Sequence, residues 1–306
     1  FVSGPTSPLR SRLMPLEMDG TLGGSSLAVL SVADAVAEQW VNASGEDLRD
    51  IQTSLDKGEM AMGFELPGIR LEANIDIEPT TARGRNVLAW LPGYHAAQPA
   101  SAAASTAAST AATTPTAGAA LPMVVVGAHI DHLGSGTGAG SLAKDDERGG
   151  VHRGADDNAS GVAGMLEIAQ YLAGEMLPPR PVHKHDILFA AWSGEELGLR
   201  GSQAFADDFA ELYPDRQQSS SASLQPAVVA NLNMDMIGRL RDSLVLQGIG
   251  SSPYWTGAIE RRNAVVRLSL TLQNDCHLPT DASTFFLHGV PILSAFTGSH
   301  DEYHTP

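Results

Sequence analysis

Side chains that bind divalent metals follow or end several of the strands that the sequence predicts. They occur in the order His129, Asp156, Glu196, Asp235 and His304. A further acid, Glu195, stands directly before Glu196. Imidazole nitrogens and carboxylate oxygens are ligands of zinc and of related first-row metals. Five such ligands could hold two divalent ions and leave one carboxylate as a base, so this set predicts a metallohydrolase.

The first two ligands lie in short motifs bounded by glycines. In GAHIDHLG, His129 and Asp131 are two residues apart and share a face of an extended chain. Asp131 is therefore predicted to orient His129 by accepting its second ring N–H. GADDNASG opens a helix with two adjacent acids, for which a helix N-cap is the alternative role. A carboxylate has two oxygens and can bridge two cations, and we assign this bridge to Asp156.

The later motifs supply the other ligands and a base. WSGEELG contains paired acids, which repel each other and are costly to bury together without a cation. We assign Glu196 as a ligand and Glu195 as the general base, with a solvated acidic turn as the alternative. NMDMIG places Asp235 at a strand end, and Tyr303 precedes His304 near the end of the chain.

Strands and helices alternate from residue 121 onward. Strands are predicted at 69–77, 86–91, 123–128, 186–192, 228–236, 244–247, 265–272 and 291–295. Helices are predicted at 44–57, 160–173, 200–212 and 284–287, with a short strand and a helix within 26–41. This alternation predicts an α/β sandwich with a largely parallel sheet, in which ligands belong at the carboxyl ends of the strands.

Composition excludes several other classes of protein. The chain has 306 residues, 43% of them hydrophobic, and a formal net charge of -16. That charge argues against nucleic acid binding, and no apolar run approaches the roughly 20 residues that span a bilayer. The single cysteine, Cys276, is interpreted as a buried hydrophobe and not as a nucleophile. Because the chain starts at Phe1 and stops at Pro306, we expect both ends to be cuts within a longer polypeptide.

Six ordered motifs carry a resemblance to a known family. AHIDHLG, GADDNASG, WSGEELG, NMDMIG, TDASTFF and YHTP together resemble the co-catalytic dizinc aminopeptidases, also called the leucyl aminopeptidase or zinc-dependent exopeptidase family. The resemblance covers about Asn86 to Pro306, apart from a low-complexity, Ala-rich segment at 96–120 that is predicted to be a surface loop. It implies a zinc-exopeptidase (phosphorylase/hydrolase-like) fold, a three-layer α/β sandwich with a mixed, largely parallel sheet.

The resemblance also implies roles for individual residues. One zinc ion would be held by His129, Asp156 and Asp235, and the other by Asp156, Glu196 and His304. Glu195 would be the general base, Asp131 would orient the first imidazole, and Tyr303 would donate a hydrogen bond to the developing oxyanion. Family members often have a cis peptide between two aspartates, here Asp156 and Asp157.

The implied activity is removal of N-terminal residues from peptides with a free amino terminus, using two Zn²⁺ ions. A carboxypeptidase or a glutaminyl cyclase of the same fold is the alternative, and a non-catalytic binding module is a third reading. Residues 1–65 are interpreted as the remnant of a protease-associated-type insertion or its linker, and residues 66–306 as the catalytic domain. The family suggests a secreted or periplasmic protein.

Overall fold

A computed structural model describes most of the catalytic region and part of what precedes it. The described residues are 4, 30–60, 62–72, 74, 82–93, 121–135, 140–144, 146–175, 185–216, 218–220 and 222–306. The chain divides into two compact units, Phe1–Arg83 with Thr137–Ser141, and Gly84–Gly136 with Leu142–Pro306. The first of these boundaries falls after Arg83. The predicted division near residue 65 stays a prediction. The predicted loop at 96–120 lies outside the described residues.

The first unit contains two short helices, α1 (Asp34–Ala43) and α2 (Leu48–Asp56). The predicted helix at 44–57 begins only at Leu48, because the Asp47 side chain caps it by accepting the backbone N–H groups of Arg49 and Asp50. The described residues of the predicted strand at 69–77, namely 69–72 and 74, are not in a strand. The identity of this unit as a protease-associated remnant remains a prediction.

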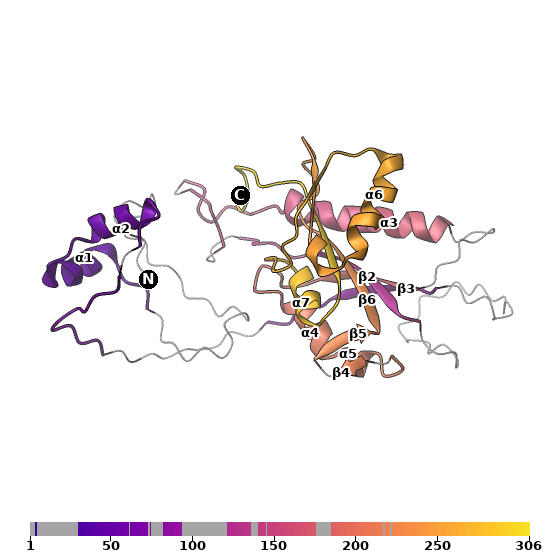
Figure 1. Cartoon of the computed structure of the whole chain (residues 1–306), viewed down its shortest axis with the longest axis horizontal. Coiled ribbons are helices and arrows are strands. Elements are labelled where there is room, and N and C mark those ends of the chain that lie inside the picture. Colours follow the sequence, from indigo (N-terminus) through magenta and orange to yellow (C-terminus); the bar gives the residue numbers. More distant parts are fainter. Residues whose placement is uncertain are drawn as a thin grey trace. The chain divides into compact units, whose positions relative to one another are not determined.

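The second unit is built on a seven-stranded sheet in the order β1-β3-β2-β6-β9-β7-β8 (Figure 1). The strands are β1 (Val87–Leu91), β2 (Met123–His129), β3 (Asp186–Trp192), β6 (Val228–Met234), β7 (Leu244–Gln247), β8 (Leu270–Leu272) and β9 (Ile292–Phe296). β3, β2, β6 and β9 are parallel, whereas β1 is antiparallel to β3 and β7 is antiparallel to β9. The prediction of a mixed, largely parallel sheet is confirmed.

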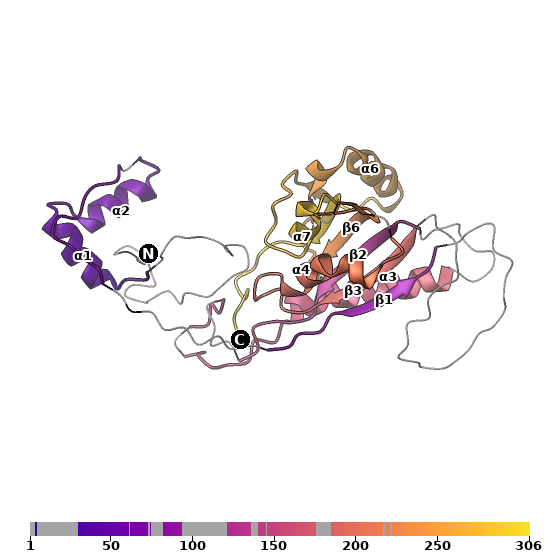
Figure 2. The same ribbon diagram turned by 90° about the horizontal axis from the view of Figure 1, so that it is seen from below.

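Helices cover both faces of this sheet (Figure 2). Alternate residues of β3 point to opposite sides: Leu188 and Trp192 pack in one core with α4 (Arg200–Asp207), α5 (Phe209–Leu212) and α7 (Ala282–Leu287), and Phe189 packs in another with α3 (Gly161–Glu175). The remaining elements are η2 (Ala155–Ser160), β4 (Gln218–Ser220), β5 (Ser223–Pro226), η3 (Ile249–Ser251) and α6 (Tyr254–Val266). The predicted three-layer α/β sandwich is confirmed.

One predicted strand is shorter than expected and begins later. The sequence predicted a strand at 265–272, but α6 runs to Val266 and only Leu270–Leu272 form β8. Val265 and Val266 are 84% and 69% exposed, so these β-branched residues pack in no sheet. β-branched residues mark a strand only where a pleated surface receives them. Among the helices of the described residues, none has the length and apolar character needed to cross a bilayer.

A buried arginine locks the sheet at the end away from the carboxyl ends of the parallel strands. Arg216 donates to the Asp186 carboxylate at 2.6 Å and to the backbone carbonyl of Leu121, and its guanidinium lies 4.4 Å from the centroid of the Trp90 ring. The other Asp186 oxygen accepts the Gly93 N–H at 2.6 Å. Arg216 and Asp186 thus connect β1, β2 and β3.

Arg216→Ala is expected to lower the free energy of unfolding by about 3–5 kcal/mol, because it leaves the Asp186 carboxylate buried without its partner. Urea unfolding followed by circular dichroism measures the change. Arg200→Ala, which removes an exposed arginine from α4, should cost under about 1 kcal/mol. Equal losses of unfolding free energy in the two variants would show that the buried Arg216–Asp186 pair stabilises the fold no more than an exposed arginine does.

Candidate metal centre

The carboxyl ends of the parallel strands bring the predicted ligands to one edge of the sheet. His129 is the last residue of β2 and pairs in register with Trp192, the last residue of β3. Gly127 of β2 pairs with Asn233 of β6, so Asp235 comes level with His129. Glu195 and Glu196 follow β3 by three and four residues. Adjacent parallel strands therefore place the imidazole between acids from both sides.

The first group of donors is His129, Asp157 and Asp235. His129 Nε2 lies 3.2 Å from Asp157 Oδ1 and 3.3 Å from Asp235 Oδ1, and the side chain is 2% exposed. Burial alone would lower the pKa of His129, yet hydrogen bonds to the two aspartates and the charges of Asp235 and Glu195 raise it to about 12. Such a concentration of buried carboxylates calls for a positive charge at this point.

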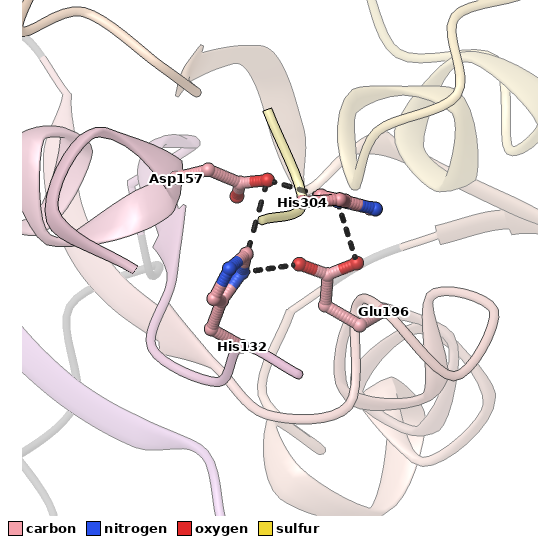
Figure 3. Close-up of side chains that lie close together, drawn as sticks. All are labelled: His132, Asp157, Glu196 and His304. Carbon is pink, nitrogen blue, oxygen red and sulfur yellow. Dashed lines mark hydrogen bonds and ion pairs between the residues drawn. The ribbon is translucent and has the colours of Figure 1, made fainter. Parts of the chain in front are cut away.

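The second group contains His132, Asp157, Glu196 and His304 (Figure 3). His304 Nε2 lies 3.2 Å from Asp157 Oδ2 and 3.4 Å from Glu196 Oε2. Asp157 therefore offers Oδ1 to the first group and Oδ2 to the second. Burial would raise the pKa of Asp157, but hydrogen bonds from His129 and His304 hold it far below its ordinary range. One carboxylate joins the two groups.

Asp157, and not the predicted Asp156, has an oxygen in each of the two donor groups, so the placement predicted for Asp156 is contradicted. Asp156 is in neither group: its Oδ1 accepts the Gly238 N–H at 2.7 Å, and its Oδ2 lies 3.2 Å from Nε2 of His300. The cis peptide also lies one residue later than expected, between Asp157 and Asn158. Asp156 ties the turn to the loops after β6 and β9.

Two neighbours of Asp157 hold it in place. The Asn158 side chain donates to the Met234 carbonyl at 3.0 Å and accepts the Gly161 N–H at 3.0 Å, which fastens η2 to the end of β6. Gly154 has φ of 62°, and a Cβ there would lie 2.8 Å from the Asp157 carbonyl oxygen and 2.9 Å from the Cβ of His132. Only glycine suits this left-handed turn, which lets the two ligand-bearing segments approach.

Asp131 acts mainly on the turn that carries the two glutamates. Its carboxylate accepts the backbone N–H of Glu195 at 3.1 Å and that of Glu196 at 3.3 Å. The closest Asp131 atom to His129 Nδ1 is the backbone carbonyl oxygen at 3.1 Å, whereas the carboxylate is 3.9 Å away. The expected contact of the carboxylate with the ring is thus replaced by a carbonyl contact, and the carboxylate orients the acids instead.

Glu195 belongs to neither donor group but faces the first. Its Oε2 lies 4.0 Å from His129 Nε2, and its side chain is 10% exposed. Burial raises the pKa of Glu195 to about 9, with contributions from the charges of Asp281, Asp235 and Glu196 and an opposing one from His129. Cations held by the two groups would lower this pKa again. Glu195 is therefore a titratable side chain beside the donor groups that is not itself one of the candidate ligands.

Tyr303 lies against the second group. Its ring stacks on His304 with centroids 3.7 Å apart, and the residue lines a cavity together with His132, Arg153, Asp157 and Arg239. Burial, followed by the charges of Asp157 and Glu196, raises the pKa of the Tyr303 phenol well above its ordinary value. The phenol therefore keeps its proton and can donate a hydrogen bond into this cavity.

The donor atoms fit zinc. Zinc–nitrogen and zinc–oxygen bonds of about 2.0–2.2 Å put two ligands of a tetrahedral ion about 3.4 Å apart. His129 Nε2 lies 3.2 and 3.3 Å from its two carboxylate neighbours, and His304 Nε2 lies 3.2 and 3.4 Å from its own. His129 with its two carboxylates, and His304 with its own two, thus have the spacing and the nitrogen–oxygen donors of a zinc site. His132 was missed in the sequence, although it stands in the same motif three residues after His129.

An α/β sandwich with two joined donor groups and a spare buried glutamate defines a metallohydrolase class of site. A model of peptidase family M28 matches residues 109–306, and the chain belongs to this family. The aminopeptidases of Pseudomonas aeruginosa strains UCBPP-PA14 and PAO1 are each 31% identical over 186 residues, which cover 58% of this chain. The match spans only 28% of the length of either relative.

Solved structures of similar proteins include two bacterial aminopeptidases. The zinc aminopeptidase BSAP from Bacillus subtilis is 24% identical, with a TM-score of 0.46 over 63% of this chain and 42% of that chain. The aminopeptidase from Aneurinibacillus sp. strain AM-1 is 20% identical, with a TM-score of 0.43 over 61% of this chain and 37% of that chain.

Proposed function

We propose that this chain is the catalytic part of an aminopeptidase that uses two zinc ions to hydrolyse the first peptide bond of substrates with a free amino terminus. The observation that carries the proposal is Asp157, which presents one oxygen to each of two zinc-like donor groups beside the buried Glu195. Membership of peptidase family M28 and the aminopeptidase relatives support the peptidase chemistry.

The residues divide the reaction between them. When bound, the two zinc ions supply Lewis-acid activation of water and of the scissile carbonyl. Glu195 takes the proton of the attacking water and later delivers it to the leaving amine. Cations bound beside it would lower the pKa of Glu195 and keep its carboxylate ionised for this role. Tyr303 donates its phenolic proton as a hydrogen bond to the oxygen on which negative charge develops. Asp131 holds the turn that aims Glu195.

The presence of two donor groups favours a peptidase over a glutaminyl cyclase. A cyclase requires a single zinc ion, so the second group would bind no metal in that alternative. A carboxypeptidase needs cationic side chains for the substrate carboxylate. Arg239, one candidate, is already paired with Glu302 at 2.7 Å. A non-catalytic module would have no use for Glu195 beside a complete donor set.

The test is zinc titration of the chelator-treated chain while hydrolysis is followed. Leucine p-nitroanilide and its N-acetylated form are the paired substrates. Activity on the free amine should rise until two equivalents of zinc are bound, and the acetylated substrate should stay intact. Saturation at one equivalent of zinc, together with cyclisation of N-terminal glutamine, would replace the proposal by the cyclase. If the zinc-loaded chain turned over no substrate with a free amino terminus or a free carboxyl terminus, catalysis would be refuted.

A further inference from the structure

His132 makes a less even pair of contacts than His304 does in the second group. Its Nδ1 lies 2.7 Å from Glu196 Oε1 and 3.8 Å from Asp157 Oδ2. Two ligands of one tetrahedral zinc ion are about 3.4 Å apart. The first separation is shorter than that and is a hydrogen-bond length, and the second is longer. His304, in contrast, is evenly spaced from the same two carboxylates, at 3.2 and 3.4 Å.

The Glu196 carboxylate is divided between these two imidazoles. Oε1 faces His132 and Oε2 faces His304, as Figure 3 shows. An ionised carboxylate only accepts hydrogen bonds, so Nδ1 of His132 must carry the proton. Oε1 is then occupied by a donor and Oε2 remains for a cation. Glu196 is held as a one-oxygen ligand with its free oxygen turned toward Asp157 and His304.

The surroundings hold the His132 ring in this orientation. The ring meets that of His304 edge to face, with centroids 5.5 Å apart, and that of His152 at 6.2 Å. The absence of a side chain at Gly154 admits the Cβ of His132 to the turn before Asp157. The His132 side chain is 12% exposed. Little freedom is left for the ring to turn and become a ligand itself.

We infer that His132 is a positioning residue: its Nδ1–H fixes the Glu196 carboxylate so that Oε2 serves the second metal. The inference rests on the proposed two-zinc function and deepens it by separating the two metals. Hydrogen bonds to metal ligands typically change metal affinity 10–100-fold. Loss of this bond should therefore weaken the second zinc ion and spare the first, which is held by His129, Asp157 and Asp235.

The experiment compares His132→Ala, His132→Asn and His132→Gln by zinc competition against a chromophoric chelator. Asn places its amide N–H where Nδ1 stands, whereas Gln carries its donor one atom further out. We expect His132→Ala and His132→Gln to weaken the second zinc about 10–100-fold, and His132→Asn to restore most of that affinity. His185→Ala, an exposed histidine that precedes β3, is the matched control and should bind both ions as the parent does.

Three outcomes overturn the inference. Equal losses in the Ala, Asn and Gln variants would make His132 a ligand, because asparagine then could not replace it. Parent-like affinity in His132→Ala would leave the residue without a role in metal binding. A parent chain that binds no second zinc removes the two-zinc proposal itself, and this result is recognised before any variant is measured. Far-ultraviolet circular dichroism identifies a variant that has failed to fold.

Discussion

Asp157→Asn is expected to release zinc from both donor groups and to lower the rate of hydrolysis by about three orders of magnitude, since metal activation contributes several kcal/mol to such reactions. Asp157 presents Oδ1 at 3.2 Å from His129 Nε2 and Oδ2 at 3.2 Å from His304 Nε2. The asparagine amide keeps one oxygen but loses the negative charge and the second acceptor oxygen. It therefore cannot offer a carboxylate oxygen to each donor group, as Asp157 does.

Asp156→Asn is the matched control, because the two acids are neighbours of identical chemistry. The asparagine oxygen can still accept the Gly238 N–H that Asp156 accepts at 2.7 Å. This variant should retain both zinc ions and lose less than about tenfold in rate, in line with loss of one contact to His300. Metal analysis after gel filtration, together with initial rates, decides the matter. Zinc loss in Asp156→Asn alone would return the bridge to Asp156.

The sequence predicted best where local pattern and packing agree. The apolar runs of β3 and β7 gave strands with the observed bounds, Asp186–Trp192 and Leu244–Gln247. Both strands lie within the sheet, with a partner on either side. α6 escaped prediction because Trp255 is its only buried residue, so its sequence lacks the apolar stripe that identifies a helix. The hairpin of β4 and β5 is similarly short of apolar pattern.

The site shows where local sequence stops being informative. Strand ends placed His129, Glu196 and Asp235 at one edge of the sheet, as predicted. The choice between Asp156 and Asp157 depends on the turn after Gly154, whose path is set by Asn158 bonding to Met234 76 residues away. His132 depends on a contact with Glu196, 64 residues distant. Neither contact has a signature within a single motif, so residue type alone could not assign them.

Glu195→Gln is expected to keep both zinc ions and to lower turnover by about 10²–10⁴-fold, the usual contribution of a general base. Glu195 is in neither donor group, so removing its charge leaves the ligands complete. Its backbone N–H still binds the Asp131 carboxylate at 3.1 Å, which keeps the turn in place. Zinc content per chain and the kcat for leucine p-nitroanilide are the two measurements.

Glu196→Gln separates the two glutamates of the same turn. Its side chain supplies Oε2 to the second group, 3.4 Å from His304 Nε2, so this variant should lose the second zinc ion and keep the first. Glu195→Gln should lose proton transfer but keep both zinc ions, whereas Glu196→Gln should lose the second zinc ion. The two variants therefore lose activity for different reasons. Turnover of substrate by Glu195→Gln at the parental rate, with both zinc ions bound, would contradict the base role. Another group near the donor groups would then have to carry the proton, and Glu195 would be only a buried neighbour of His129.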